Sequence, residues 1–257
     1  MRTRLATGLI GVLAAALLAP ATVAHAQDPD QRTATTAPAP KPFAIAAPSR
    51  AQGATTARIV APTFARRRLA SRAGGWKVGP ETEWSGRPQT LLVLDAATRE
   101  RRDWVKLLLA HRPNGSAGWV PHDLVELSRS RYWIDIRTAA RRVTVYRSGK
   151  RIRRLRAVVG TSGTPTPHGL TAIYEINRQP DPRAFLGPWV LSLSVHSNVL
   201  KSFGGGPGRV GIHGRSSASL QDPLGSAGSH GCIRIDNHQI TWMAATIPPG
   251  TPVRIRT

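Results

Sequence analysis

Proline and glycine interrupt the C-terminal half of this chain so often that long helices are excluded over most of it. Between these breaks lie short runs with the alternation of β-strands. In residues 132–137 apolar and polar side chains alternate, and residues 143–146 lead through Ser148-Gly149-Lys150 into residues 151–160, which is a hairpin signal. Further runs of this kind are residues 170–176, 190–195 and 210–212. The sequence therefore predicts a mainly β domain.

One helix is expected near the C-terminus. Asp236 and Gln239 have the spacing of a helix-capping pair, and Pro248-Pro249-Gly250 ends the segment. Four apolar residues follow the cap at helical spacing: Ile240, Met243, Ala244 and Ile247. We expect this short helix to pack against the sheet and to fix the loop that precedes it.

That loop contains the only cysteine of the chain, Cys232. His230 lies two positions before it, and His213 is separated from Ser229 by fifteen residues, 214 to 228. An ordinary thiol is only a few per cent thiolate at neutral pH, and a neighbouring imidazole supplies the base that it lacks. A buried inert cysteine is the usual alternative, but the flanking histidines favour a nucleophile, Cys232, and a base, His213.

The neighbours of the cysteine suit acyl transfer. Gly231 allows a substrate carbonyl to approach the main chain, where the N–H groups of Gly231 and Cys232 are the candidate oxyanion hole. His196, His213, His230 and Cys232 are also of metal-ligating types, but no paired cysteines or carboxylate cluster accompany them, so no metal is expected. For His196 we expect a packing or surface role.

The segment from His213 through Ser229-His230-Gly231-Cys232 to Arg234 resembles the signature of the L,D-transpeptidase (YkuD-type) family. Thr164-Pro165-Thr166-Pro167-His168-Gly169 and Gly250-Thr251-Pro252-Val253 match further blocks in the order of that family. The resemblance covers residues 129–257 and implies a YkuD-like β-sandwich with one short helix after the nucleophile.

The same resemblance implies a function: cross-linking of peptidoglycan stem peptides through a thioester on Cys232, with carbapenem β-lactams as inhibitors and no cofactor. His213 is the expected base, and the carbonyl of Gly214 is expected to orient its ring. His230 is expected to support the nucleophile, Ser229 to shape its loop and contact the substrate, and Arg234 to bind a substrate carboxylate. Two alternatives stay open: an L,D-carboxypeptidase that uses water as acceptor, and a noncatalytic wall-binding protein.

The N-terminus predicts export. Arg2 and Arg4 precede an apolar run that ends at Pro20, and Ala24-His25-Ala26 is a cleavage signal, so residues 1–26 are predicted to be a signal peptide. A lone cysteine in an exported chain closes no intramolecular disulfide. Residues 27–55, rich in Ala, Thr and Pro, are predicted to be a linker.

Charge constrains the partners. The chain carries a formal charge of +22, and the predicted signal peptide contributes only two of these charges. In the extracytoplasmic space and cell wall, where the protein is expected, anionic wall polymers are the candidate polyanions. No nucleic-acid module is recognised, and nucleic acid is not an expected partner.

Residues 56–128 form the remaining unit. Short β-rich runs are bounded there by turn clusters, and Gly118-Trp119-Val120-Pro121 with the runs around it resembles bacterial SH3-like domains. The resemblance predicts a small SH3-like β-barrel before the catalytic domain. It is either a wall-binding module or a structural unit packed on its neighbour. Tryptophans in such a unit are more often core residues than surfaces on which sugar rings stack.

Overall fold

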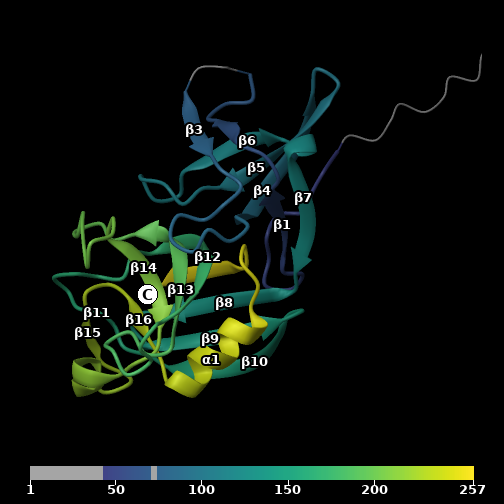
Figure 1. Ribbon diagram of the computed structural model, residues 1–257. Helices are drawn as coiled ribbons and strands as arrows, with labels where there is room; N and C mark the ends of the chain where they lie inside the picture. The colour runs from purple at the N-terminus through teal and green to yellow at the C-terminus, as the bar shows by residue number, and fades with distance from the viewer. Residues whose placement is uncertain (1–42, 71–73) are drawn as a thin grey trace, which may run out of the picture. The chain divides into compact units, whose positions relative to one another are not determined.

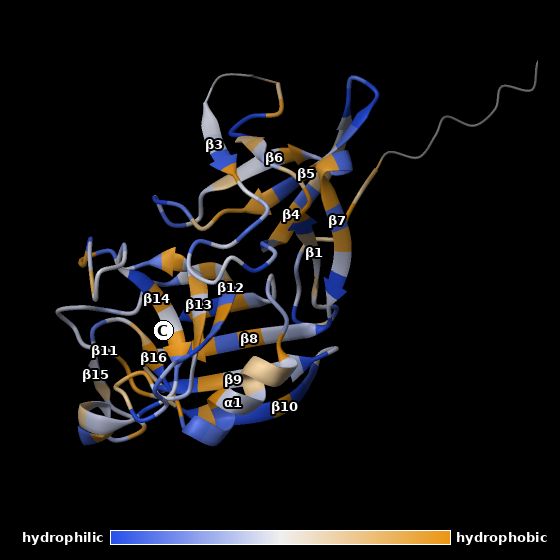
Figure 2. Ribbon diagram, viewed as in Figure 1, coloured by the Kyte–Doolittle hydropathy of each residue, from blue (hydrophilic) through white to orange (hydrophobic). Residues whose placement is uncertain are grey.

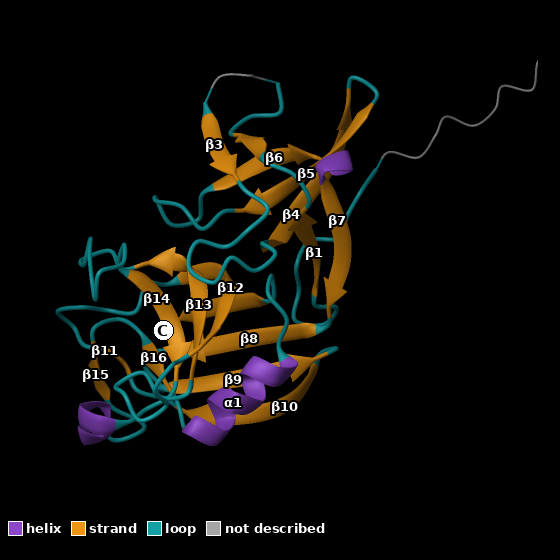
Figure 3. Cartoon of the chain, in the orientation of Figure 1, coloured by secondary structure: helices purple, strands orange, loops and turns teal. Residues whose placement is uncertain are grey.

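The computed structural model describes residues 43–70 and 74–257. The predicted signal peptide, residues 1–26, and residues 27–42 of the predicted linker lie outside this part. The described residues are mainly β, as predicted, and Figure 3 shows strands and loops around a single α-helix, α1 (Asn237–Thr246), and two short 3-10 turns, η1 (His122–Leu124) and η2 (Ser217–Gln221). Within that part of the chain no helix has the length and hydropathy needed to cross a bilayer.

The first sheet is built from residues 54–130. Its seven strands run in the order β3-β2-β6-β5-β4-β1-β7 (Figure 1). They are β1 (Ala54–Ile59), β2 (Thr63–Arg66), β3 (Gly75–Val78), β4 (Thr90–Arg99), β5 (Arg102–Leu108), β6 (Ala117–Pro121) and β7 (Val125–Ser130). Phe43 and Ile45 belong to the predicted linker, yet both pack against the core of this sheet. The SH3-like barrel stays a prediction.

The second sheet contains eight strands in the order β10-β9-β8-β17-β12-β13-β14-β16. They are β8 (Tyr132–Arg137), β9 (Arg142–Arg147), β10 (Lys150–Arg156), β12 (Gly169–Arg178), β13 (Trp189–His196), β14 (Arg209–His213), β16 (Ile233–Arg234) and β17 (Pro252–Arg256). A separate parallel pair joins β11 (Val159–Gly160) to β15 (Ala227–Ser229). The hairpin predicted from Ser148-Gly149-Lys150 is β9–β10.

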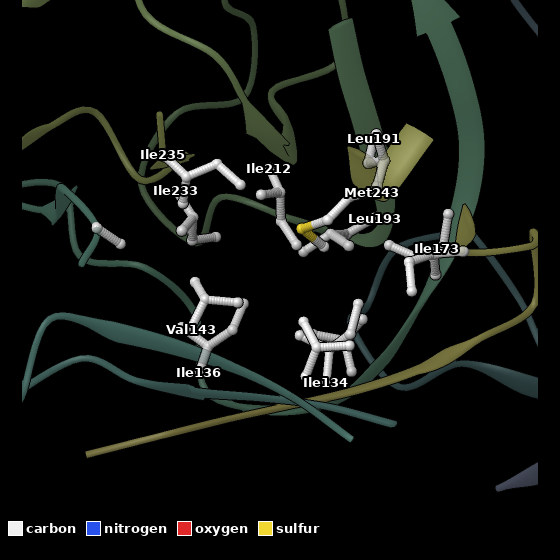
Figure 4. Packing of buried hydrophobic residues seen from close by; sticks show 14 of the residues in the cluster. Ile134, Ile136, Val143, Ile173, Leu191, Leu193, Ile212, Ile233, Ile235 and Met243 are labelled. Carbon is white, nitrogen blue, oxygen red and sulfur yellow. The ribbon is translucent and has the colours of Figure 1, made fainter. Parts of the chain in front are cut away.

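This eight-stranded sheet curls so that its two halves face each other across one core. Figure 4 shows Ile134, Ile136 and Val143 of β8 and β9 pointing toward Ile212 of β14 and Ile233 of β16. All five side chains are 0% exposed, and burying each contributes roughly 1.5–3 kcal/mol. The predicted sandwich is therefore a single hydrogen-bonded sheet folded over on itself.

Helix α1 closes this core beside the nucleophile loop, as the sequence predicted. The side chain of Asp236 caps the helix by accepting a hydrogen bond from the N–H of His238. The expected reciprocal bond from Gln239 is not among the hydrogen bonds of the described residues, and Gln239 Oε1 has no partner there. Ile240, Met243 and Ile247 are buried in the core, so the predicted apolar stripe is confirmed.

The two sheets share a second, smaller core. Ala54, Leu92 and Leu108 of the first sheet pack with Ala172 and Leu170 of β12. The outer face of the eight-stranded sheet is thus covered at β12 by the first sheet.

Candidate active site

Strand pairing brings Cys232 to His213. β14 and β16 run parallel with Ile212 opposite Ile233 and His213 opposite Arg234. Because side chains alternate along a strand, the two isoleucines point into the core, whereas His213, Arg234 and the preceding residue, Cys232, share the other face. The fifteen residues that separate His213 from Ser229 are the connection that makes this pairing possible. The side chains of Cys232 and His213 line one cavity.

His213 is held as a neutral base. Its side chain is 2% exposed, and Nδ1 lies 2.8 Å from the carbonyl oxygen of Gly214. A carbonyl only accepts hydrogen bonds, so Nδ1 carries the proton and Nε2 is left as an acceptor. Burial lowers the pKa of His213 to about 4; the carbonyls of Gly214 and Leu186 oppose this effect, and the charge of Arg234 adds to it. At neutral pH the imidazole is therefore uncharged and can take a proton.

Cys232 is held as a neutral thiol. Its side chain is half-buried. Burial raises the pKa of the Cys232 thiol, while a hydrogen bond from the main chain of Gly211 and the positive charge of Arg234 act in the opposite direction. The resting pair is consequently thiol and imidazole rather than thiolate and imidazolium, and the proton is transferred during attack.

Comparison with known proteins finds a family to which part of this chain is similar. The model of the YkuD family, the L,D-transpeptidase catalytic domain, matches residues 131–255. This segment is therefore similar to a YkuD-type domain. The YkuD proteins of Bacillus licheniformis and Bacillus subtilis are each 32% identical to the chain over 124 residues, which is 48% of this chain and 65% of theirs. The chain thus spans less than two thirds of the length of these curated relatives.

The solved structures to which the chain is similar include L,D-transpeptidases. One from Mycobacterium smegmatis is 15% identical, with 66% of this chain and 91% of that one covered and a TM-score of 0.38. LdtMt1 in complex with imipenem is 17% identical, with 84% and 100% covered and a TM-score of 0.42. The catalytic domain of the E. faecium L,D-transpeptidase acylated by ertapenem is 20% identical, with 50% of this chain and 99% of that one covered and a TM-score of 0.37.

Ser229 stabilises the loop that carries Cys232, the predicted nucleophile. It is 1% exposed, its Oγ donates to the carbonyl of Cys232 at 2.5 Å, and it accepts from the N–H of Gly231 at 3.1 Å. The sequence predicts that Ser229 contacts the substrate and that the N–H of Gly231 is a free oxyanion donor. In the structure the Ser229 hydroxyl and the Gly231 N–H are bonded to each other within the loop. Gly231 adopts φ 115, a conformation that favours glycine.

Arg234 has a protein partner that sequence reasoning missed. Its side chain is 3% exposed, NH1 is paired with Asp222, and its guanidinium lies 4.8 Å from the ring centroid of Phe185. Nothing in the order of residues marks Asp222 as this partner, because it lies in the connection that precedes the nucleophile loop.

The block Thr164 to Gly169 also supports this loop. Thr166 Oγ1 donates to the carbonyl of Gly231 at 3.0 Å, and Thr164 Oγ1 donates to the carbonyl of Ser229 at 3.2 Å. The sequence linked this block to the family by resemblance only; the structure shows that its threonines hold the main chain beside Cys232.

Two loops close the cavity over Cys232. Phe185 and Leu186 come from the β12–β13 loop, and Leu200 and Phe203 from the β13–β14 loop, leaving about 30 Å³, enough for about one water molecule. His230 is exposed, and its ring stacks on Phe203 with centroids 5.6 Å apart. A ligand larger than a water molecule therefore needs these loops to open.

The second of these loops is fastened to the first sheet. Arg112 donates to the carbonyls of Ser197, Leu200 and Pro207 at 2.8, 3.1 and 3.1 Å. Asn114 exchanges hydrogen bonds with the main chain of His196, at 2.7 and 2.8 Å. His196 itself is 3% exposed and packs inside, and burial lowers its pKa to about 4.

Proposed function

We propose that the protein is a peptidoglycan L,D-transpeptidase that joins two stem peptides through a thioester on Cys232. The observation that carries this proposal is the neutral Cys232–His213 pair on one face of β14 and β16, inside a YkuD-type domain. The stem peptides and the extracytoplasmic location belong to this proposal as what the family implies, and the signal peptide belongs to it as the prediction made from residues 1–26.

The first half-reaction forms the thioester. His213 Nε2 takes the proton from Cys232 as Sγ bonds to a carbonyl carbon of the donor stem. The resulting tetrahedral oxyanion collapses, the bond to the terminal D-alanine breaks, and His213 returns the proton to the departing amine. Because the pKa of His213 is about 4, the imidazolium is a strong enough acid to protonate that amine.

The second half-reaction consumes the thioester. The amine of a diamino acid in a second stem attacks the same carbonyl, His213 accepts its proton, and Sγ leaves and is reprotonated as the thiol. Water in place of the amine gives the carboxypeptidase, which uses the same residues.

Three predicted contacts belong to this mechanism. The N–H of Cys232 is the first oxyanion donor, and the N–H of Gly231 joins it only if its bond to Ser229 Oγ is released. Arg234 lines the cavity, and its Nε has no partner within the described residues, so we keep it as the contact for a substrate carboxylate. His230, stacked on Phe203, is a supporting group at the entrance.

Intact-protein mass spectrometry tests the proposal. The protein is incubated with a purified disaccharide-tetrapeptide and, separately, with a carbapenem. We expect an adduct on the wild type and a cross-linked dimer of the tetrapeptide; Cys232→Ala should give neither. Release of D-alanine without dimer would establish the carboxypeptidase instead.

Matched variants separate the roles. His213→Gln should slow adduct formation strongly, whereas His238→Gln, a change of an exposed histidine on α1, should leave it unchanged. If the wild type acquires no adduct from either reagent, the nucleophile assignment fails and the noncatalytic wall-binding protein becomes the better explanation.

A further inference from the structure

The outer face of the eight-stranded sheet carries a row of arginines across four strands. Arg256 of β17 lies opposite Arg137 of β8, Arg137 opposite Arg142 of β9, and Arg142 opposite Arg156 of β10. Residues directly opposite each other share a face of the sheet, and strands are about 4.8 Å apart, so the row spans about 14 Å.

A second row runs beside it on the same face. It consists of Arg254, Asp135, Thr144 and Arg154, two residues along each strand from the first. Next to it Arg151 lies opposite Tyr146, and the guanidinium of Arg50 lies 5.0 Å from the ring centroid of Tyr146. Figure 2 shows β10, the edge strand of this face, as a largely hydrophilic segment. We name these two rows with Arg151 and Arg50 the arginine face.

Little negative charge compensates the arginine face. Of the ion pairs among residues 43–70 and 74–257, only that between Arg256 and Asp135 involves it. Like charges directly opposite each other in a sheet destabilise it, so the row costs stability in the free protein. A bound polyanion would remove this repulsion.

The arginines are not explained by protection of a sheet edge. Cationic side chains often guard edge strands against pairing with other chains, and β10 is such an edge. However, Arg137, Arg142 and Arg256 lie on interior strands, where no edge needs protection. Beside the row, Arg50, Trp133, Asp135, Arg254 and Arg256 line a hollow of about 550 Å³.

We propose that the arginine face binds a phosphodiester-linked polymer that carries no bases. Proteins that bind single-stranded nucleic acid add exposed aromatic side chains on which bases stack, whereas Trp133 is 8% exposed and Tyr146 is covered by Arg50. Binding at a membrane surface uses exposed apolar side chains, and on the β9–β10 hairpin only Ile152 is a large exposed one. The surface would hold the enzyme among anionic polymers.

Binding of poly(glycerol phosphate) at increasing salt concentration tests this proposal without any assay of catalysis, so its failure leaves the transpeptidase proposal standing. Removing three contacts in the variant Arg137→Gln, Arg142→Gln, Arg154→Gln should reduce the slope of log K against log salt by about 2. Between 50 and 200 mM salt, the factor by which the affinity of the variant falls should therefore be about 20 times smaller than the factor for the wild type. The matched control is Arg99→Gln, Arg101→Gln, Arg129→Gln on the first sheet, which removes the same charge and should keep the wild-type slope.

Stability gives a second readout. Relief of like-charge repulsion should raise the urea midpoint of the triple variant at low salt. If that variant does not fold, Arg151→Gln with Arg154→Gln on the exposed edge strand replaces it and should reduce the slope by about 1.4.

Three results would overturn the proposal. The first is a slope of log K against log salt that is the same for the triple variant and the wild type. A control variant whose slope falls as much as that of the triple variant would count equally against the proposal. The second is single-stranded DNA of the same phosphate number binding more than about tenfold tighter, which would assign the face to nucleic acid. The third is binding to vesicles of anionic lipid without binding to the free polymer.

Discussion

The depressed pKa of His213 ties the stability of the protein to pH. A free histidine titrates near pH 6.5, whereas burial lowers the pKa of His213 to about 4. Between these values the unfolded chain binds a proton that the native state does not, so the free energy of unfolding falls as pH decreases. The contribution of the neutral His213 to the free energy of unfolding is fully present above pH 6.5 and is lost as pH falls from 6.5 to about 4.

The size of the effect follows from the shift. At pH 5 the unfolded imidazole is almost fully protonated and the native one hardly at all, which corresponds to about 2 kcal/mol. His196, with its pKa also lowered to about 4 by burial, contributes a similar amount. The wild type should therefore lose about 4 kcal/mol between pH 8 and pH 5 from these two side chains.

Urea unfolding at pH 8 and pH 5 measures this loss. His213→Gln should reduce the loss by about 2 kcal/mol, His196→Gln by a similar amount, and the double variant by about 4 kcal/mol. Only the difference between the two pH values enters, so the effect of each substitution on packing cancels. If His213→Gln loses as much stability as the wild type, His213 is not held neutral by burial and the general-base argument fails.

Three further predictions concern the site. Because burial raises the pKa of Cys232, its acylation by a carbapenem should still accelerate with pH at pH 9; a plateau below about pH 8 would show an acidic thiol instead. Arg112→Gln removes the donor to three carbonyls of the β13–β14 loop and should raise KM for the donor peptide by about tenfold, with a smaller change in kcat. Arg112→Lys should not restore the wild-type KM. An equal rise of KM in Arg99→Gln would refute the role of Arg112. Asp222→Asn leaves Arg234 buried without its counter-ion and should lower the unfolding free energy by roughly 3 kcal/mol in urea, whereas a loss under about 1 kcal/mol would contradict the role of the pair.

Local signals in the sequence predicted local structure well. The β9–β10 hairpin follows from Ser148-Gly149-Lys150, and α1 from Asp236 and the apolar stripe after it. The proximity of His213 to Cys232 was inferred from residue types and spacing, and the pairing of β14 with β16 supplies the physical cause.

Contacts between distant segments could not be read from the sequence. The bond of Arg234 to Asp222 depends on the path of a connecting loop, and the stacking of Phe203 on His230 joins two loops that share no sequence signal. The arginine face needs the register of four strands, since a shift of one residue would send its side chains into the core.

The hydrogen bonds that hold the β13–β14 loop have a consequence for how short a fragment of this protein can be made. The family model begins at residue 131, whereas Arg112 and Asn114 lie before it. They make four hydrogen bonds to the β13–β14 loop over Cys232 and two more to His196 at the end of β13. A fragment trimmed to the family boundary would keep every residue of the proposed chemistry and lose the anchor of its lid. The domain boundary given by sequence similarity thus differs from the one given by the contacts, and the shortest fragment that keeps the anchored loop includes the first sheet.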